Sequence, residues 1–137
     1  MSYKIIEITS QETLAIRHQV MWPNKPLDYI KLPKDNEGRH YGLFLEDQLI
    51  SVISLFIHHK EAQFRKFATL ESHQGKGYGS ILLNEIMQIA ATESLTKIWC
   101  NARQSKTNYY TKFGMKVTNK TYVKGGIDFV IMERTFS

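Results

Sequence analysis

The stretch Gln74-Gly75-Lys76-Gly77-Tyr78-Gly79 has three glycines at alternate positions, between an apolar run that ends at Leu70 and a helical pattern that begins at Ser80. Glycine permits backbone angles that other residues avoid, and it leaves room for a ligand to approach the main chain. The N–H groups of such a turn and the positive end of the following helix attract an anion. The stretch therefore predicts a phosphate-binding cradle.

Two common phosphate-binding motifs do not fit this cradle. A Walker loop requires Ser or Thr directly after its lysine, and Lys76 is followed by Gly77. A dinucleotide-binding fingerprint spaces its glycines GxGxxG after a strand of a βαβ unit, whereas this loop has GxGxG and follows β-hairpins. Taken alone, the cradle indicates an anion site without deciding between ATP, NAD and coenzyme A.

The first half of the chain is expected to be a strand, a helix, a long loop and an antiparallel sheet. Thr9 and Glu12 form a capping box for the helix, and all three prolines fall in the loop, which is expected to hold at most one short helix. The short turns between the later strands imply hairpins. The expected elements are a strand at 3–8, a helix from 10 to about 21, a loop from 22 to 39 and strands at 41–46, 49–58 and 62–70.

The second half is expected to continue the same sheet beyond a helix. The strand after this helix must run parallel to the strand before it, because a helix crossover separates them. Gly114 is expected to end a second, short helix in the left-handed conformation. The expected elements are helices at 80–94 and 105–113, a strand at 97–100, and strands at 115–123 and 127–134 joined at Gly125-Gly126. The predicted fold class is α/β, with a mixed sheet of about seven strands flanked by helices.

Length and composition fit one compact domain covering residues 1–137, of which 42% are hydrophobic. No apolar run reaches the roughly 18 residues of a membrane helix, and the first residues do not resemble a secretion signal, so a cytoplasmic protein with no membrane partner is expected. Cys100 is the single cysteine, which excludes an internal disulfide. The five histidines show no metal-ligand spacing, so no metal is expected.

The net charge of +5 is spread along the chain rather than gathered in a stripe. A nucleic-acid-binding domain is therefore the weakest of the functional classes considered. The same positive field would attract a polyanionic cofactor equally well.

Three segments resemble the GNAT (N-acetyltransferase) superfamily. Gln74-x-x-Gly77-x-Gly79, behind a hairpin and ahead of an amphipathic helix, looks like its acyl-CoA signature, and Tyr109-Tyr110-Thr111-Lys112-Phe113-Gly114-Met115 resembles its aromatic-Tyr-x-x-x-Gly stretch. Residues 99–103 resemble the fifth strand of some small members, while Lys106 stands where the family often has Ala. The order of elements matches along essentially the whole chain. The resemblance implies a small, single-domain GNAT fold with a parallel pair of strands splayed around an acyl-CoA site.

By this resemblance, the protein is an N-acetyltransferase that moves an acetyl group from acetyl-CoA directly to a primary amine in a ternary complex. The backbone at 65–70 would pair with the pantetheine arm and face the thioester oxygen, and the cradle would hold the pyrophosphate, with Lys76 near a phosphate. The residues expected to bind the cofactor are Phe67, Ala68, Thr69, Gln74, Gly75, Lys76, Gly77, Tyr78, Gly79, Ser80, Asn101 and Tyr110.

Acyl transfer from a thioester needs a neutral amine, an oxyanion donor and a proton for the departing thiolate. Tyr110 occupies the family's tyrosine position and is the candidate general acid, with a structural aromatic residue as the alternative. Glu71, just past a strand end, is the candidate base, with a solvated loop carboxylate as the alternative. Cys100 lies on an apolar strand, so we expect a small buried hydrophobic residue rather than a nucleophile.

The loop at 22–39 lies where GNAT proteins build part of the acceptor pocket. Candidate acceptor-binding residues are Trp22, Asp28, Tyr29, Arg17, His40, Arg65 and Arg103. Clustered arginines would favour an acceptor with a carboxylate or phosphate. The expected acceptor is a small molecule, with a protein N-terminus or lysine as the weaker alternative. A catalytically silent acyl-CoA sensor is the rival class, and edge-to-edge pairing of the last hairpin would give a homodimer.

Overall fold

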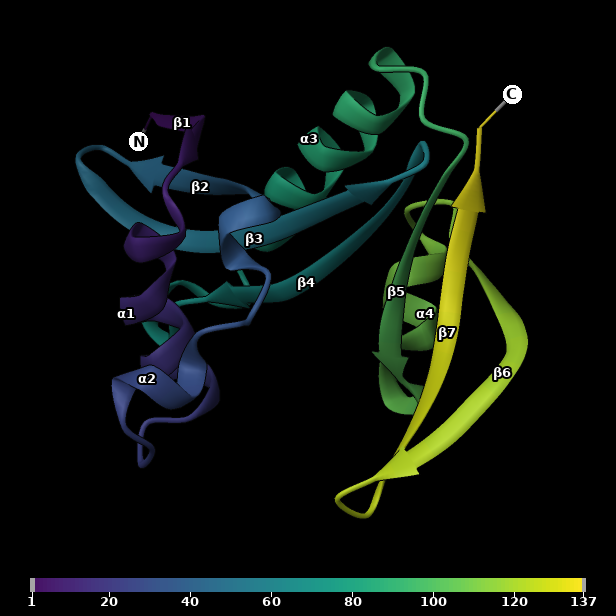
Figure 1. Ribbon diagram of the computed structural model, residues 1–137. Helices are drawn as coiled ribbons and strands as arrows, with labels where there is room; N and C mark the ends of the chain where they lie inside the picture. The colour runs from purple at the N-terminus through teal and green to yellow at the C-terminus, as the bar shows by residue number, and fades with distance from the viewer. Residues whose placement is uncertain (1, 137) are drawn as a thin grey trace.

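The computed structural model describes residues 2–136, so Met1 and Ser137, the ends of the expected domain, lie outside the described residues. Its centre is a seven-stranded sheet in the order β1-β2-β3-β4-β5-β7-β6 (Figure 1). The strands are β1 Tyr3–Ile8, β2 Arg39–Leu45, β3 Gln48–His58, β4 Glu61–Thr69, β5 Lys97–Arg103, β6 Lys116–Lys124 and β7 Ile127–Thr135. The α-helices are α1 Ser10–Met21, α2 Leu27–Ile30, α3 Tyr78–Thr92 and α4 Thr107–Thr111. The expected mixed α/β fold is confirmed.

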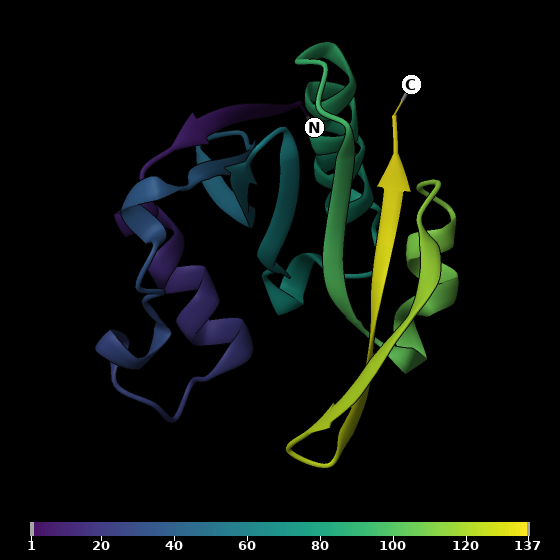
Figure 2. The same cartoon turned by 45° about the vertical axis from the view of Figure 1, so that its right-hand side comes forward.

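The sheet divides into an antiparallel half and a C-terminal half that meet at a parallel pair of strands. Strands β1 to β4 pair antiparallel in sequence order. Strand β4 pairs parallel with β5 only between residues 61–63 and 97–99. Beyond these residues the two strands separate, as the views in Figures 1 and 2 agree in showing. The expected splayed parallel pair is therefore present, and it leaves one edge of β4 without a strand partner over residues 64–69.

A β-bulge distorts β4 where it leaves β5. Val52 of β3 lies opposite Ala68, but Ser54 lies opposite Arg65, so three steps along β4 match two steps along β3. Lys66 sits inside this bulge with a φ of 54°, which is uncommon for a residue other than glycine. A bulge bends its strand and re-aims side chains. The part of β4 that has no strand partner on this edge is thus turned away from β5.

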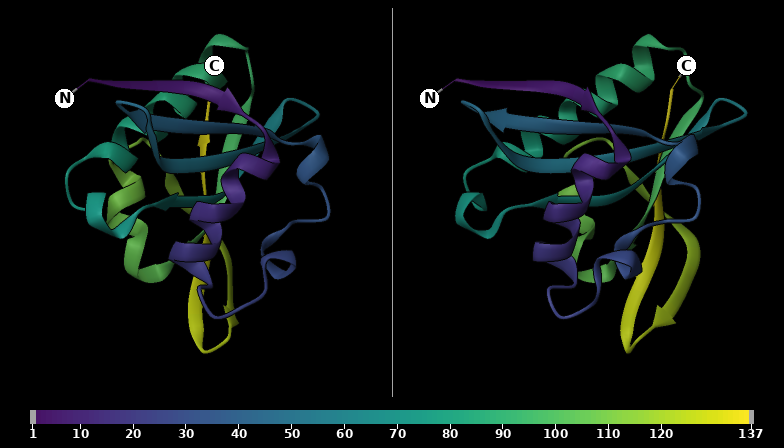
Figure 3. Two further views of the ribbon diagram at one scale, coloured as in Figure 1. Left: turned by 90° about the vertical axis from the view of Figure 1, so that its left-hand side faces the viewer. Right: turned by 60° about the vertical axis from the view of Figure 1, so that its left-hand side comes forward.

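Helices α1 and α3 pack on opposite faces of the sheet (Figure 3). The larger core lies under α3, where Leu82, Leu83 and Ile86 contact the inner residues of β2 to β5 and β7. The smaller core lies under α1, where Ile16 packs with Ile8, Val52 and Ala68. Outside the bulge, alternation along a strand therefore assigns its side chains to the α1 face or the α3 face.

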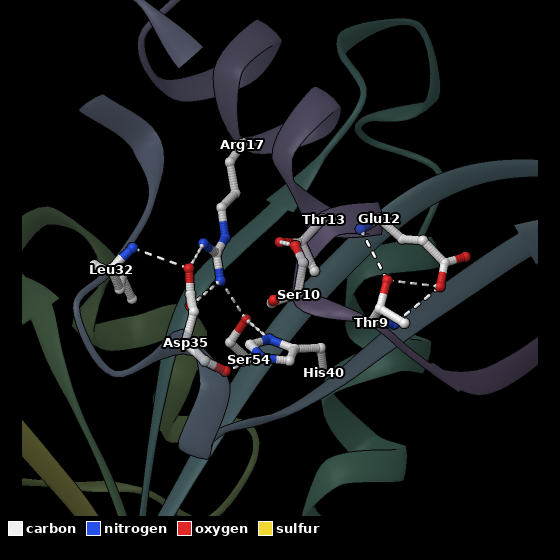
Figure 4. A network of polar contacts seen from close by, with 9 residues as sticks. All are labelled: Thr9, Ser10, Glu12, Thr13, Arg17, Leu32, Asp35, His40 and Ser54. Carbon is white, nitrogen blue, oxygen red and sulfur yellow. Dashed lines mark hydrogen bonds and ion pairs between the residues drawn. The ribbon is translucent and has the colours of Figure 1, made fainter. Parts of the chain in front are cut away.

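The sequence-predicted caps are present. Thr9 Oγ1 accepts a hydrogen bond from the Glu12 N–H at 3.2 Å, and the Thr9 N–H donates to Glu12 Oε1 at 2.9 Å (Figure 4). Gly114 follows α4 with a φ of 83°. The helix α4 is shorter than expected because a 3₁₀ turn at Gln104–Lys106 forms its first part.

The C-terminal hairpin enters the sheet in an order that the sequence did not indicate. The last strand, β7, lies between β5 and β6, so β6 is the outer edge strand. The loop at 22–39 holds α2 and a 3₁₀ turn at Asp35–Glu37. No helix in the described part of the chain is long and apolar enough to cross a membrane.

Candidate active site

A cleft of about 630 Å³ opens where β4 and β5 separate. It is lined by residues from the end of α1, the bulged half of β4, the cradle, the start of α3, β5, α4 and β7. Among the residues predicted to bind the cofactor, all but Lys76 line this cleft: Phe67, Ala68, Thr69, Gln74, Gly75, Gly77, Tyr78, Gly79, Ser80, Asn101 and Tyr110. One space therefore brings together segments that are far apart in the sequence.

The cradle forms the start of α3 and leaves its N–H groups available. Gly77 is the residue before the helix, with a φ of 88°, and no side chain accepts a hydrogen bond at this cap. The first turn of α3 also holds no acidic side chain. Gln74 Nε2 donates to the Thr69 carbonyl at 2.8 Å, which ties the loop to the end of β4. Such a helix terminus favours an anion in the cleft.

The close approach between the cradle and β4 favours glycine at position 79. A Cβ at this position would lie 3.1 Å from Thr69 Oγ1 and 3.3 Å from Phe67 Cζ. The absence of that Cβ lets α3 start directly against β4, so the unpaired edge of the strand and the N–H groups of the helix face the same space.

The two neighbouring tyrosines of α4 differ in their partners. The Tyr109 hydroxyl shares a hydrogen bond with Ser80 Oγ at 3.0 Å. The centroid of the Tyr110 ring lies 5.8 Å from that of Phe64 and 5.3 Å from that of Tyr109. The Tyr110 hydroxyl has no hydrogen-bond partner among residues 2–136. Burial raises the pKa of Tyr110 well above its ordinary value, so this phenol keeps its proton at neutral pH.

Cys100 lines the cleft beside this tyrosine but remains a thiol. It is buried, and burial raises its pKa to about 12. The thiolate is the nucleophilic form of cysteine. This environment agrees with the interpretation of Cys100 as a small apolar residue.

A second group of lining residues lies on the α1 face of the sheet. On β5, Ile98, Cys100 and Ala102 belong to the core under α3, so Asn101 and Arg103 face the other side. The register pairs Arg103 with Phe129 of β7. Arg65, Lys66, Val20 and Met21 complete this side of the cleft.

Sequence reasoning missed Lys66. Its Nζ lies 4.1 Å from the centroid of the Trp22 ring, which places a cation at the end of α1. The bulge produces this position, and one sequence signal marks the bulge: the apolar residues Ala62, Phe64 and Phe67 break the two-residue period of a strand.

Several of the predicted site residues do not line the cleft. Glu71 is exposed in the 3₁₀ turn after β4, and Lys76 is exposed in the cradle. Tyr29 is 55% exposed and packs edge to face against Trp22, with the ring centroids 5.7 Å apart. Trp22 reaches the cleft only through its contact with Lys66.

His40 and Arg17 belong to a buried network instead of the cleft (Figure 4). Arg17 donates two hydrogen bonds to the Asp35 carboxylate, at 2.8 and 3.0 Å, and a third to Ser54 Oγ at 2.8 Å. His40 contacts Ser54 Oγ at 2.7 Å and the Asp35 carbonyl at 2.9 Å. The network ties the loop at 22–39 to α1 and β3.

The Asp35 carboxylate is held in its charged form. Burial alone would raise its pKa, but hydrogen bonds from Arg17 and from the Leu32 N–H outweigh burial, and the pKa lies below the ordinary value. An ion pair with these bonds satisfies the charge of a fully buried arginine. We therefore assign Arg17 and His40 to the scaffold of the loop. No group of three or more His, Cys, Asp or Glu suited to a metal occurs within residues 2–136.

A sheet splayed between β4 and β5, with a cradle at the N-terminus of α3 and a tyrosine across the cleft, defines an acyltransferase of the GNAT type. The chain belongs to the acetyltransferase (GNAT) family, whose family model matches residues 4–115. It is 30% identical to the uncharacterized N-acetyltransferase YitI of Bacillus subtilis, over 93% of each chain.

Solved structures show the same fold. A chain from Lactobacillus plantarum assigned to the N-acetyltransferases superimposes with a TM-score of 0.85 at 21% identity, over 98% of this chain and 99% of that one. The PaiA N-acetyltransferase from Thermoplasma acidophilum, solved in complex with coenzyme A, gives a TM-score of 0.73 at 21% identity, over 98% and 99%. The membership of the GNAT family that the cradle and the tyrosine motif predict is confirmed by the family model and by the relative from Bacillus subtilis.

Proposed function

We propose that the protein transfers an acetyl group from acetyl-CoA to the primary amine of a small molecule, directly, in a ternary complex. The observation that carries this proposal is the single cleft that joins three features: the free N–H groups at the start of α3, the unpaired edge of β4 and the Tyr110 side chain. A structural neighbour with this fold holds coenzyme A, which supports an acyl-CoA donor.

Each part of acetyl-CoA has a complementary feature in the cleft. The pyrophosphate needs N–H donors and a favourable helix end, which Gly77 and the residues after it provide. The pantetheine arm carries amides, and residues 64–69 of β4 offer unpaired backbone groups that bind an extended ligand as a further strand would. The thioester then lies between the bulge and Tyr110.

The reaction forms one bond and breaks another. The neutral amine nitrogen attacks the thioester carbonyl carbon, a backbone N–H on the edge of β4 without a strand partner stabilises the oxyanion, and the C–S bond breaks as the amide forms. Tyr110, which is protonated at neutral pH, donates its proton to the departing sulfur, and the phenolate regains a proton from water. The nitrogen loses one proton; Glu71, exposed beside the cleft, would accept it only through water.

The experiment measures cofactor binding and turnover separately. Calorimetry with acetyl-CoA tests the cleft, and release of free CoA thiol over a panel of small primary amines tests transfer. We expect micromolar acetyl-CoA binding and thiol release with at least one amine. Binding without release on any amine would instead support a silent acyl-CoA module, and no acetyl-CoA binding would contradict the proposal.

A further inference from the structure

We infer that the acceptor amine carries an anionic group, a carboxylate or a phosphate, which Arg65, Lys66 and Arg103 bind on the α1 side of the cleft. This inference rests on the acetyl transfer proposed above. The inference adds the chemical class of the acceptor to that proposal.

The three cations lie on two strands that separate around the cleft. Arg65 and Lys66 lie in the bulge of β4, and Arg103 ends β5 opposite Phe129. All three line the cleft. The φ of 54° at Lys66 and its contact with the Trp22 ring direct this side chain to the α1 face, away from the core under α3.

No acidic side chain of the protein neutralises these cations. Among the described residues, none of the three forms an ion pair, and no Asp or Glu lines the cleft. Cations that line one cleft without a carboxylate partner favour an anionic ligand. A second ammonium on the acceptor would be repelled there.

Lys66 is the cation that most needs such a ligand. Burial, followed by the charges of Arg65 on β4, Arg17 on α1 and Lys124 on β6, lowers its pKa to about 8, against a smaller opposite effect of Asp35. An anion beside Lys66 would restore its ordinary basicity. The cluster is thus electrostatically strained in the free protein and relieved by a negative charge.

The placement of these cations separates them from the expected phosphates of acetyl-CoA. Arg65 and Lys66 precede Phe67 in β4, whereas the cradle follows Thr69 and leads into α3 on the other face. Arg103 faces the α1 side together with Asn101. The cluster therefore lies beyond the thioester, where an acceptor enters.

Three amines with the same reacting group test the inference. These are 4-(aminomethyl)benzoate, benzylamine and 4-(aminomethyl)benzylamine, in which the remote group is negative, absent or positive. We expect kcat/KM for the carboxylate to exceed that for benzylamine by at least about tenfold, the equivalent of one charge-assisted contact, and the diamine to be poorest. O-phosphoethanolamine against ethanolamine tests a phosphate in place of the carboxylate.

Charge reversal locates the contact. Lys66→Glu and Arg103→Glu are expected to abolish the preference for the anionic amine and to improve the diamine, while the Kd of acetyl-CoA stays within about twofold. Lys66→Gln is the milder variant if the reversal disturbs folding. Lys4→Glu makes the same change of net charge on the edge strand β1, remote from the cleft, and is expected to leave the order of the amines unchanged.

Three results would overturn the inference. If benzylamine or the diamine is preferred, the inferred anionic group on the acceptor is wrong, while the proposed acetyl transfer still stands. Weaker acetyl-CoA binding in Lys66→Glu with unchanged amine selectivity assigns the cluster to the cofactor. If no amine releases thiol, the proposed transfer fails, and calorimetric titration of the same amines into the CoA complex decides: tighter binding of the carboxylate or phosphate supports the inference, and equal binding overturns it.

Discussion

Replacing Gly77 by alanine tests the cradle at the residue where backbone and ligand meet. Gly77 has a φ of 88° and lines the cleft, and a Cβ there would have no protein atom within 4 Å. The methyl group therefore projects into free space and crowds no neighbour. Gly125, in the turn between β6 and β7, has a φ of 57° and the same open surroundings, but it does not line the cleft. Gly125→Ala is thus a matched control for backbone strain.

Both variants are expected to lose similar stability. A non-glycine residue in the left-handed region costs roughly 1–2 kcal/mol, and the stiffer unfolded chain returns about 0.4–1 kcal/mol. The net loss is about 1 kcal/mol. With an unfolding entropy of about 2.1 cal/mol/K per residue, the Tm falls by about 3–4 °C in a chain of this length.

Only Gly77→Ala is expected to lose cofactor affinity. The added methyl group obstructs one hydrogen bond between a backbone N–H and a phosphate oxygen, worth about 1.5–3 kcal/mol, so Kd for acetyl-CoA rises roughly 10- to 150-fold. Thermal unfolding and calorimetry measure the two effects on the same samples. Equal acetyl-CoA affinity in both variants, with similar Tm losses, would refute the assignment of the cradle to the pyrophosphate.

Three further outcomes are expected. Tyr110→Phe lowers kcat by about 100-fold or more, whereas Tyr109→Phe, which loses only a hydrogen bond to a serine, keeps most of its turnover in the thiol-release assay. The ratio of kcat/KM for 4-(aminomethyl)benzoate to that for benzylamine falls as the pH rises through about 8, where Lys66 loses its proton. Asp35→Asn leaves Arg17 without its buried counter-charge and lowers the free energy of unfolding by about 3 kcal/mol in urea titrations.

Each of these outcomes has a contrary result. Full turnover in Tyr110→Phe would leave protonation of the thiolate to water. A pH-independent ratio would separate Lys66 from the acceptor, because both amines carry the same reacting group. For Asp35, the lowered pKa means that stability is present at neutral pH and is lost as acid protonates the carboxylate below its ordinary pKa; an unchanged acid transition in Asp35→Asn would contradict the role of the ion pair.

The sequence predicts the parts of the fold whose determinants are local. The capping box at Thr9, the left-handed glycine at 114 and the turn at Gly125-Gly126 each follow from a few adjacent residues. The parallel pairing of β4 and β5 follows from the helix between them. The position of β7 between β5 and β6 depends on which edge the last strand finds, and no local residue carries that information.

The candidate site divides in the same way. The proposed cofactor side would use backbone N–H groups, and its mark in the sequence is the glycines at 75, 77 and 79. The proposed acceptor side consists of long side chains whose direction depends on the bulge at Lys66, and a shift of one residue reverses the face of every side chain before it. The sequence predicts His40 and Arg17 as contacts of the acceptor, but the structure buries both of them against Asp35 of the proline-rich loop. The sequence next to either residue does not reveal this partner.

The positive acceptor side also bears on the missing base. No carboxylate from residues 2–136 lines the cleft, yet the amine in the proposed reaction must be neutral. An ammonium group placed near Arg65, Lys66 and Arg103 is destabilised by like charges, so its pKa falls and the neutral form is favoured at the thioester. Under the inference drawn above, the remote anionic group keeps the acceptor bound while its amine gives up a proton to water. The same three cations can thus select the acceptor and prepare its nitrogen for attack.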